Sequence, residues 1–287
     1  MKEKFINPFT DFGFKKLFGE EKNKDLLIDF LNELLKEKGQ ITDISFLKNE
    51  QLGVSEADRK AVFDLYCQND KGEKFIVELQ KAKQKFFRDR SLYYATFAIQ
   101  EQAQKGDWDY QLQGVYTIAV MDFIFDELPK NDNKLRHNIQ LLDVETKEIF
   151  YDKLMFIYLE MPKFTKSIDE LETHYDKWLF LLQNLSKLDH IPTKLQEKIF
   201  LRLFEIAEIA KYDEKEQRAY QDSLKYYRDL KNIMDTAIEE ALDKKLVEIA
   251  KNLITLGIDN ETIGKGTGLN IGEIERLRIE LKNSEKY

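Results

Sequence analysis

The chain is poor in the residues that build disulfide frameworks and zinc sites. It contains one cysteine and three histidines in 287 residues, which excludes an internal disulfide and a thiolate metal cage. The cysteine, Cys67, lies in an apolar run typical of a strand. We expect it in the core, because free cysteine is usually buried. His137, His174 and His190 lie far apart without metal-ligand spacing, so we expect them on the surface or in loops.

Long apolar segments are also missing. No run approaches the roughly 20 apolar residues of a membrane span, and the opening MKEKFINPF lacks the apolar core of a signal peptide. We therefore expect a cytoplasmic protein with no membrane partner. The formal net charge of −8 argues against bulk attraction to nucleic acid, although a local basic patch can still bind phosphate. No nucleotide cofactor is expected, because the chain has no G-x-x-x-x-G-K-[ST] loop.

The apolar residues that are present predict a clear order of elements. Helical spacing marks 24–38 and about 86–104, and the region from 195 to 256 is almost wholly helical. The predicted strands are 43–49, 60–67, 74–80, 114–123, 136–143 and 154–160. The first six elements have the order αβββαβ. This order predicts an α/β fold with a mixed sheet, followed by an all-helical C-terminal region.

Two acids face each other in the predicted hairpin of 60–67 and 74–80. If the turn centres on Lys71, antiparallel pairing sets Asp64 opposite Glu78 and Val62 opposite Gln80. The other face then carries only apolar residues, namely Phe63, Leu65, Cys67, Phe75, Val77 and Leu79. Two carboxylates so close repel each other unless a proton or a cation lies between them. The alternative is a pair of ordinary exposed strand acids without a ligand.

A divalent metal would resolve this repulsion. Mg²⁺ accepts one or two carboxylates and keeps waters for substrate phosphates. Gln80 points to the same side of the strand as Glu78, where its amide is placed to orient an attacking water. We therefore identify this pair as a candidate Mg²⁺ or Mn²⁺ site.

A basic segment follows the second acid. KAKQKFFRDR, residues 81–90, contains Lys81, Lys83, Lys85, Arg88 and Arg90 against Asp89 alone. Phosphodiester cleavage suits such a neighbourhood, because metals bind the reacting phosphate while lysine and arginine bind the flanking ones. A solvated helix start is the alternative interpretation. Together, the acid pair and the basic segment favour a nuclease over a binding module.

These residues also resemble a known family. Asp64 followed by Glu78-Leu79-Gln80, in the αβββαβ order, resembles the PD-(D/E)xK nuclease core in the form found in the bacterial recombination-promoting nuclease and transposase family. The stretches INPFTDFGFKKLFG (6–19), RSLYYATFAIQEQAQKGDWDYQLQGVYTIAVMDF (90–123) and YLEMPKF (158–164) match as well. The resemblance implies metal-dependent endonucleolytic cleavage of DNA, linked to recombination or mobile elements. It predicts a nuclease domain at 1–185, a helical region at 186–245 and a helix-turn-helix-like tail at 246–287.

The resemblance also assigns roles. Asp64 and Glu78 become the metal ligands, with the Leu79 backbone carbonyl completing the site. Gln80 stands where the superfamily pattern has lysine, which removes a positive charge. Catalysis is then either slow or draws its cation from Lys81 or Lys83.

The opening motif allows two interpretations. In the first, Asp11 is the N-cap of a helix whose Phe14 and Phe18 pack inward. In the second, Asp11 is a third acid near the metals, and Lys15 or Lys16 contacts phosphate. Both remain open at the level of sequence.

The tail predicts three short helices, with one ending at Gly257 and others starting after Asp259 and near 271. Their expected core is Ile249, Leu253, Ile254, Ile258, Ile263, Leu269, Ile271, Ile274 and Leu277. The tail is similar to a resolvase-type helix-turn-helix, whose last helix enters the major groove. Its basic stripe is thin, so dimerisation or partner docking is the alternative. For the whole chain, the alternative is a catalytically inactive DNA- or partner-binding protein of a transposase-like family.

Overall fold

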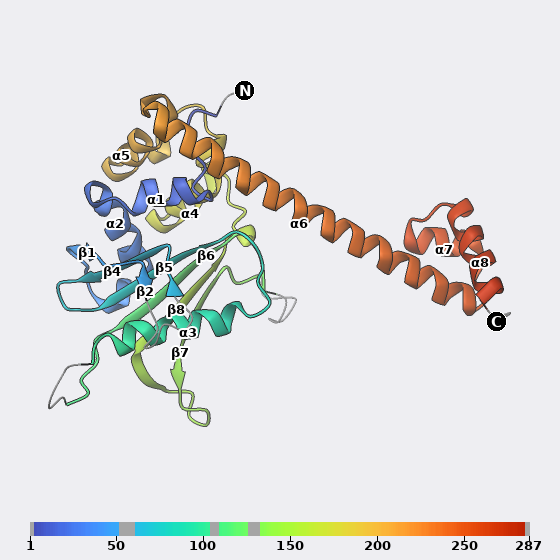
Figure 1. The fold of residues 1–287 in the computed structure, drawn as a ribbon, viewed down its shortest axis with the longest axis horizontal. Coiled ribbons are helices and arrows are strands. Elements are labelled where there is room, and N and C mark those ends of the chain that lie inside the picture. The colour runs from blue at the N-terminus through green and yellow to red at the C-terminus, as the bar shows by residue number, and fades with distance from the viewer. Residues whose placement is uncertain (1–2, 52–60, 104–108, 126–132, 285–287) are drawn as a thin grey trace. The chain divides into compact units, whose positions relative to one another are not determined.

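A computed structural model describes residues 3–51, 61–103, 109–125 and 133–284 of the chain. The chain divides into two compact units, Met1–Tyr227 and Arg228–Tyr287. The first unit is an α/β fold in which helices cover both faces of a mixed sheet (Figure 1). The predicted fold class is therefore confirmed. The three-part division made from the sequence stays a prediction. In the described ranges, no helix is long and apolar enough to cross a membrane.

A six-stranded sheet forms the centre of the first unit. In spatial order its strands are β1 (Ile44–Phe46), β4 (Leu65–Asn69), β5 (Lys74–Gln80), β6 (Val115–Met121), β8 (Ile149–Glu160) and β7 (Arg136–Leu142). The three strands β5, β6 and β8 are parallel, and the remaining neighbours pair antiparallel. Every residue of β5 and β6 is buried. Burial on both faces explains the apolar runs in these two strands, whereas the polar Glu78 and Gln80 of β5 are buried as well.

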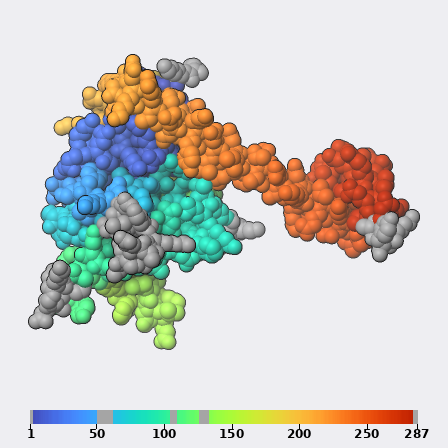
Figure 2. All heavy atoms as spheres, viewed as in Figure 1, coloured from blue at the N-terminus to red at the C-terminus, as the bar shows by residue number. Residues whose placement is uncertain are grey.

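Helices cover both faces of the sheet (Figure 1). One face carries α1 (Asp11–Phe18), α2 (Lys24–Leu34), α4 (His174–Asn184) and α5 (Lys198–Ala207), and the other carries α3 (Phe87–Gln100). The N-terminal helices (blue) and the first strands (light blue and cyan) form one continuous surface (Figure 2). Cys67 is fully buried in the larger core, as the sequence predicts.

The predicted hairpin register is confirmed for the residues of β4. It is wrong for the residues that precede β4 in the predicted strand. Leu65 pairs with Val77 and Cys67 with Phe75, but β3 (Ala61–Val62) pairs with β2 (Glu50–Gln51) instead of with Gln80. The chain bends at Asp64, and Phe63 consequently packs in the core on the α3 face, away from Leu65 and Cys67. The bend arises because the side chain and amide of Asp64 bind β5 directly, in place of ladder hydrogen bonds.

The helix of the opening motif is capped by Thr10, so the predicted Asp11 cap is wrong. The Thr10 hydroxyl accepts a hydrogen bond from the Gly13 amide at 2.9 Å and donates one to the Asn7 carbonyl at 2.7 Å. Gly13 is required here, because a Cβ at this position would lie 2.2 Å from the Asn7 carbonyl oxygen. Phe14 and Phe18 are buried, as predicted.

Two histidines lie deeper than the sequence suggests. His137 is buried in β7, where its Nε2 lies 3.2 Å from a carboxylate oxygen of Glu160. His174 lies half-buried in the first turn of α4, between Asp29 and Glu197. The surface expectation is therefore wrong for His137, because an acid in the neighbouring strand gives its ring a partner inside the protein. His190 is exposed, as expected.

The second unit contains the latter part of α6 (Glu214–Thr255) with α7 (Asn260–Thr267) and α8 (Ile271–Ser284). Its helix ends are as predicted, with Gly257 and Gly268 at positive φ and Asp259 capping α7. Its buried core is Ala250, Ile263, Ile274 and Leu277, with Val247, Leu253, Ile254, Ile258 and Leu269 packed against it. Ile249 and Ile271 are exposed instead of buried, because each lies on the outer face of its helix.

The cap at the opening helix gives a stability prediction. Thr10→Ala should lower the free energy of unfolding by about 1 kcal/mol, because the Gly13 amide loses its acceptor. Asp11→Ala should change it by less than about 0.5 kcal/mol, since the Asp11 side chain is half exposed. Urea unfolding followed by tryptophan fluorescence measures both. Equal losses in the two variants would contradict the assignment of the cap.

Candidate active site

The carboxyl ends of the three parallel strands meet at one edge of the sheet. Gln80 of β5 pairs with Met121 of β6, which pairs with Glu160 of β8. Open α/β sheets bind ligands beyond this edge. Asp64 also lies there, because β4 runs antiparallel to β5 and begins just after it. The topology thus brings together Asp64, Glu78 and Gln80, which the sequence proposed as one site.

The two acids are joined through the backbone. The Asp64 amide donates to Glu78 Oε1 at 3.3 Å, and the Leu79 amide donates to Asp64 Oδ2 at 2.7 Å. Gln80 Nε2 donates to Glu78 Oε2 at 3.2 Å. Glu78 and Gln80 are buried. The acids are therefore held beside each other by the bend before β4, not by a cross-strand pair.

Burial strongly affects the acidity of this pair. It raises the pKa of Glu78 to about 8, with the neighbouring charge of Asp64 as the second cause. Burial also raises the pKa of Asp64; Asp11 adds to the increase, while Lys15 and Lys81 oppose it. A pair of this kind retains a proton near neutral pH unless a cation takes the place of that proton.

Arg90, predicted to contact phosphate, is bound to the acid pair. Its Nη2 lies 3.3 Å from Glu78 Oε2, its Nη1 donates to Gln84 at 2.7 Å, and its guanidinium lies over the Tyr94 ring. The buried Nε of Arg90 has no hydrogen-bond partner among the described residues. Arg90 therefore offsets part of the negative charge on Glu78.

The opening helix lies beside Asp64. A cleft of about 360 Å³ is lined by both elements and by the start of α6. Asp11 and Lys15 line it and form an ion pair at 3.0 Å. Lys16 also lines the cleft, but its side chain is almost completely buried and its ammonium binds Glu20 and Glu216. The structure thus brings Asp11 and Lys15 near Asp64, while the charge of Lys16 is directed to other acids.

The sequence analysis missed the contribution of α6. The Ser223 hydroxyl accepts from the Phe12 amide at 3.0 Å, and the Tyr220 hydroxyl accepts from the Asn7 amide at 2.9 Å. The Tyr227 hydroxyl donates to Asp122, just beyond β6, at 2.8 Å. The sole signal in the sequence is the group of tyrosines in an otherwise charged helix, and such a pattern does not identify their partners.

The basic segment divides into two parts. Lys81 is partly buried near Asp64 and Asp11, and its ammonium lies 5.8 Å from the centre of the Tyr226 ring. Burial lowers the pKa of Lys81. Lys83, Lys85 and Arg88 are exposed and line a separate pocket at the start of α3. Lys81 is thus part of the acid site, and the other three cations lie in the neighbouring pocket.

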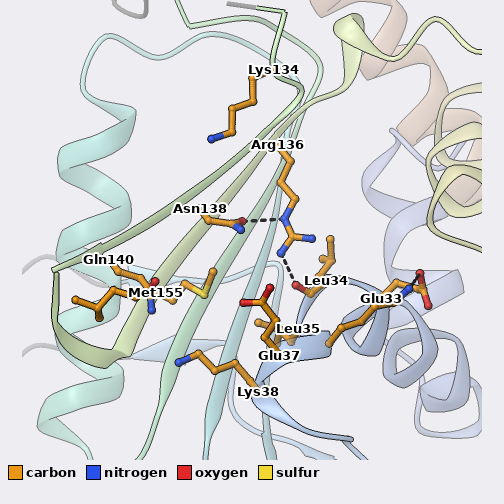
Figure 3. A pocket seen from close by; sticks show the side chains of 12 residues that line it. Glu33, Leu34, Leu35, Glu37, Lys38, Lys134, Arg136, Asn138, Gln140 and Met155 are labelled. Atoms are coloured by element: carbon orange, nitrogen blue, oxygen red, sulfur yellow. Dashed lines mark hydrogen bonds and ion pairs between the residues drawn. The ribbon is translucent and has the colours of Figure 1, made fainter. Parts of the chain in front are cut away.

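A third hollow, of about 500 Å³, lies between the end of α2 and β7 (Figure 3). Arg136 crosses it and is bound on both sides, to the Asn138 side chain and to the Leu34 carbonyl (Figure 3). Lys38 is paired with Asp152. None of the residues predicted from the sequence lines this hollow, so it is not the predicted site.

The donor set can be compared with the needs of a metal. Within the described ranges, no three or more His, Cys, Asp or Glu side chains form a metal-binding group. The adjacent carboxyl groups of Asp64, which is partly buried, and Glu78, which is buried, fit Mg²⁺ or Mn²⁺. These ions accept one or two carboxylates and complete their coordination with water and phosphate. They do not suit a closed structural zinc site, which needs four protein ligands.

The comparisons agree with this geometry. A family model described as PD-(D/E)XK nuclease family transposase matches residues 8–237. The match includes the opening helix, the acid pair, the basic segment and the first half of α6. No curated protein and no solved structure matches the chain significantly. The resemblance noted in the sequence is confirmed, and this chain belongs to the PD-(D/E)XK nuclease family transposases.

Proposed function

We propose that the protein is a Mg²⁺- or Mn²⁺-dependent DNA endonuclease acting in recombination or in mobile elements. The observation that carries the proposal is the pair formed by the buried Glu78 and the partly buried Asp64 at the sheet edge, whose pKa values are both raised. A protein gains little from burying two acids side by side unless a ligand uses them. Family membership supports nuclease chemistry independently of this argument.

Asp64 and Glu78 would hold the metal, with the Leu79 carbonyl as a further donor. When bound, the metal supplies Lewis-acid stabilisation of the reacting phosphate. Gln80 keeps its amide nitrogen on Glu78, which leaves its amide oxygen to accept a hydrogen bond from the attacking water. Lys81 supplies the positive charge that the superfamily lysine would provide, since it lies near Asp64 and is partly buried. Lys15, which lines the cleft beside Asp64, is a second cation near this acid.

Arg90 would change partners in this scheme. In the structure its Nη2 lies 3.3 Å from Glu78 Oε2. A cation on Glu78 would repel the guanidinium, which then has a substrate phosphate as its natural partner. The pocket at the start of α3 is lined by three further cations, Lys83, Lys85 and Arg88, which would bind flanking phosphates.

The contact of Arg90 with Glu78 also favours a second candidate function. If this ion pair is permanent, the chain is an inactive DNA- or partner-binding member of the family. The helical C-terminal region would then provide the interaction, as a homodimer or as a DNA-binding tail. The thin basic stripe of the tail consists of Arg276, Arg278 and Lys282. Arg278 already binds Asn260 and the Ile258 carbonyl, which weakens the case for base reading by that helix.

Cleavage is tested most directly on supercoiled plasmid DNA. The protein should nick or linearise it with Mg²⁺ or Mn²⁺ and be inactive in EDTA. Asp64→Ala should reduce the rate to background, because the metal loses a ligand. The control is Asp169→Ala, an exposed acid in a different part of the first unit. Cutting by Asp64→Ala at the rate of this control would refute the proposal.

Metal binding separates the two candidate functions. Calorimetric titration with Mn²⁺ should detect a site that Glu78→Ala removes and that Glu145→Ala, an exposed control, leaves intact. The active nuclease needs this site to exist before DNA is added. A protein with no heat of binding lost in Glu78→Ala would instead be the inactive scaffold.

The raised pKa of Glu78 predicts how stability depends on pH in EDTA. In the folded protein Glu78 keeps its proton up to about pH 8, whereas the unfolded chain releases it near the ordinary value of 4.5. The folded state binds more protons between these values, so the free energy of unfolding should fall as pH rises through this window. Glu78→Gln cannot titrate and should show a shallower decline in urea unfolding from pH 5.5 to 8. Parallel curves for wild type and variant would contradict the raised pKa.

A further inference from the structure

A pocket of about 550 Å³ lies at the start of α3, beside the residues that follow β6. It is lined by Lys83, Gln84, Lys85, Phe86, Phe87, Arg88, Asp89, Phe123 and Phe125. Among the described residues of its lining, three cations outweigh one acid, although the whole chain carries a net charge of −8. Four aromatic rings lie among these cations. Interleaved aromatic and basic side chains are typical of surfaces that bind single-stranded nucleic acid.

The floor of this pocket is fixed before any ligand arrives. Phe87 and Phe123 are buried, with ring centres 6.2 Å apart. The backbone amide of Phe125 donates to the fully buried carboxylate of Glu160 at 2.6 Å. The Arg88 guanidinium lies over the Phe125 ring, 4.8 Å from its centre. A flat ligand would therefore meet a preorganised surface of rings and a guanidinium plane, on which bases stack well.

Phe86 forms the rim of the pocket. Its side chain is 65% exposed and belongs to neither core cluster of the first unit. The Lys85 ammonium lies 5.5 Å from the centre of its ring. A large apolar ring left in water beside a cation contributes little to folding, but it offers a stacking surface with a phosphate contact next to it.

The pocket and the acid pair lie at the same edge of the sheet. Gln80 and Met121 are paired, Lys83 follows Gln80 by three residues, and Phe123 follows Met121 by two. The start of α3 serves both sites, because Arg90 bonds Glu78 while Arg88 lines the pocket. A nucleotide whose phosphate lies near the acids would thus have its neighbour within reach of the pocket.

We infer that this pocket binds an unpaired nucleobase of the DNA strand, stacked on Phe86 and on the Arg88 guanidinium that covers the Phe125 ring, with Lys83 and Lys85 at the adjacent phosphates. The identity of the ligand as DNA rests on the proposed function. The inference adds the substrate class, which is DNA with unpaired nucleotides beside the cut, such as a single strand, a flap or a gap. In an uninterrupted duplex both faces of every base are covered by its neighbours, so no base can enter the pocket without unstacking.

Binding in EDTA tests this inference without cleavage. Fluorescence anisotropy with labelled oligonucleotides should show that the full-length protein binds a gapped duplex more tightly than an uninterrupted duplex of the same length. Phe86→Ala should weaken binding to the gapped duplex about tenfold and leave binding to the uninterrupted duplex unchanged. Phe86→Trp should retain the preference, and its added tryptophan emission should be quenched by the gapped duplex.

Phe150 provides the matched control. It is an exposed phenylalanine in β8, ten residues before Glu160, which places it about 33 Å along an extended strand from the carboxyl edge. Phe150→Ala should bind both DNAs like wild type. The inference is overturned if Phe86→Ala behaves like Phe150→Ala, or if it weakens binding to both DNAs equally.

These outcomes are distinct from failure of the nuclease proposal. If Asp64→Ala still cuts plasmid DNA but Phe86→Ala loses the preference for the gap, base stacking in the pocket is supported and the assignment of the acids as metal ligands is refuted. If Asp64→Ala is inactive and Phe86→Ala binds both DNAs like wild type, the assignment of the acids is supported and base stacking in the pocket is refuted. A protein that binds neither DNA in EDTA overturns the pocket as well, because stacking and the three cations do not depend on the metal.

Discussion

The arrangement at the sheet edge depends on two neighbouring carboxyl groups, that of Glu78 buried and that of Asp64 partly buried. Removing Asp64 and Glu78 from water raises both of their pKa values, and such groups are costly unless protons, hydrogen bonds or cations compensate. The compensation here is local, through the Leu79 amide for Asp64 and through Gln80 and Arg90 for Glu78. The bend before β4 follows from these contacts, because the Asp64 amide leaves the strand ladder to reach Glu78.

The surroundings of this pair come from parts of the chain that are far apart. The opening motif and the start of α6 are separated by about 200 residues, yet Tyr220 and Ser223 bind backbone amides of the motif. Gly13 permits the tight turn in which the Asn7 carbonyl lies against the helix. This packing holds Asp11 and Lys15 in the cleft beside Asp64. The first turns of α6 therefore belong to the first unit.

The end of β8 connects the sheet to the aromatic pocket. Glu160 is fully buried and binds His137, Lys163 and the Phe125 amide at once. Removing this carboxylate would leave two partly buried donors and a buried histidine without this partner, which is a costly change in a protein interior. The YLEMPKF motif thus has a structural role, because it fixes the segment after β6 on which Phe123 and Phe125 lie. Under the proposed function, DNA cleavage and recognition of the DNA strand take place at the same edge of the sheet.

Local sequence patterns were sufficient to predict the order of elements, the helix ends in the tail, the Leu65–Val77 register and the grouping of Asp64, Glu78 and Gln80. These features follow from local periodicity, turn residues and a short motif, so neighbouring residues suffice to predict them. The folded structure was needed to reveal the bend at Asp64, the Thr10 cap, the binding of Arg90 to Glu78 and the contacts of Tyr220 and Ser223. Each of these depends on which side chains meet when layers pack, and no local pattern encodes a partner many residues away. The same reason explains why Ile249 and Ile271, apolar at suitable positions, remain exposed.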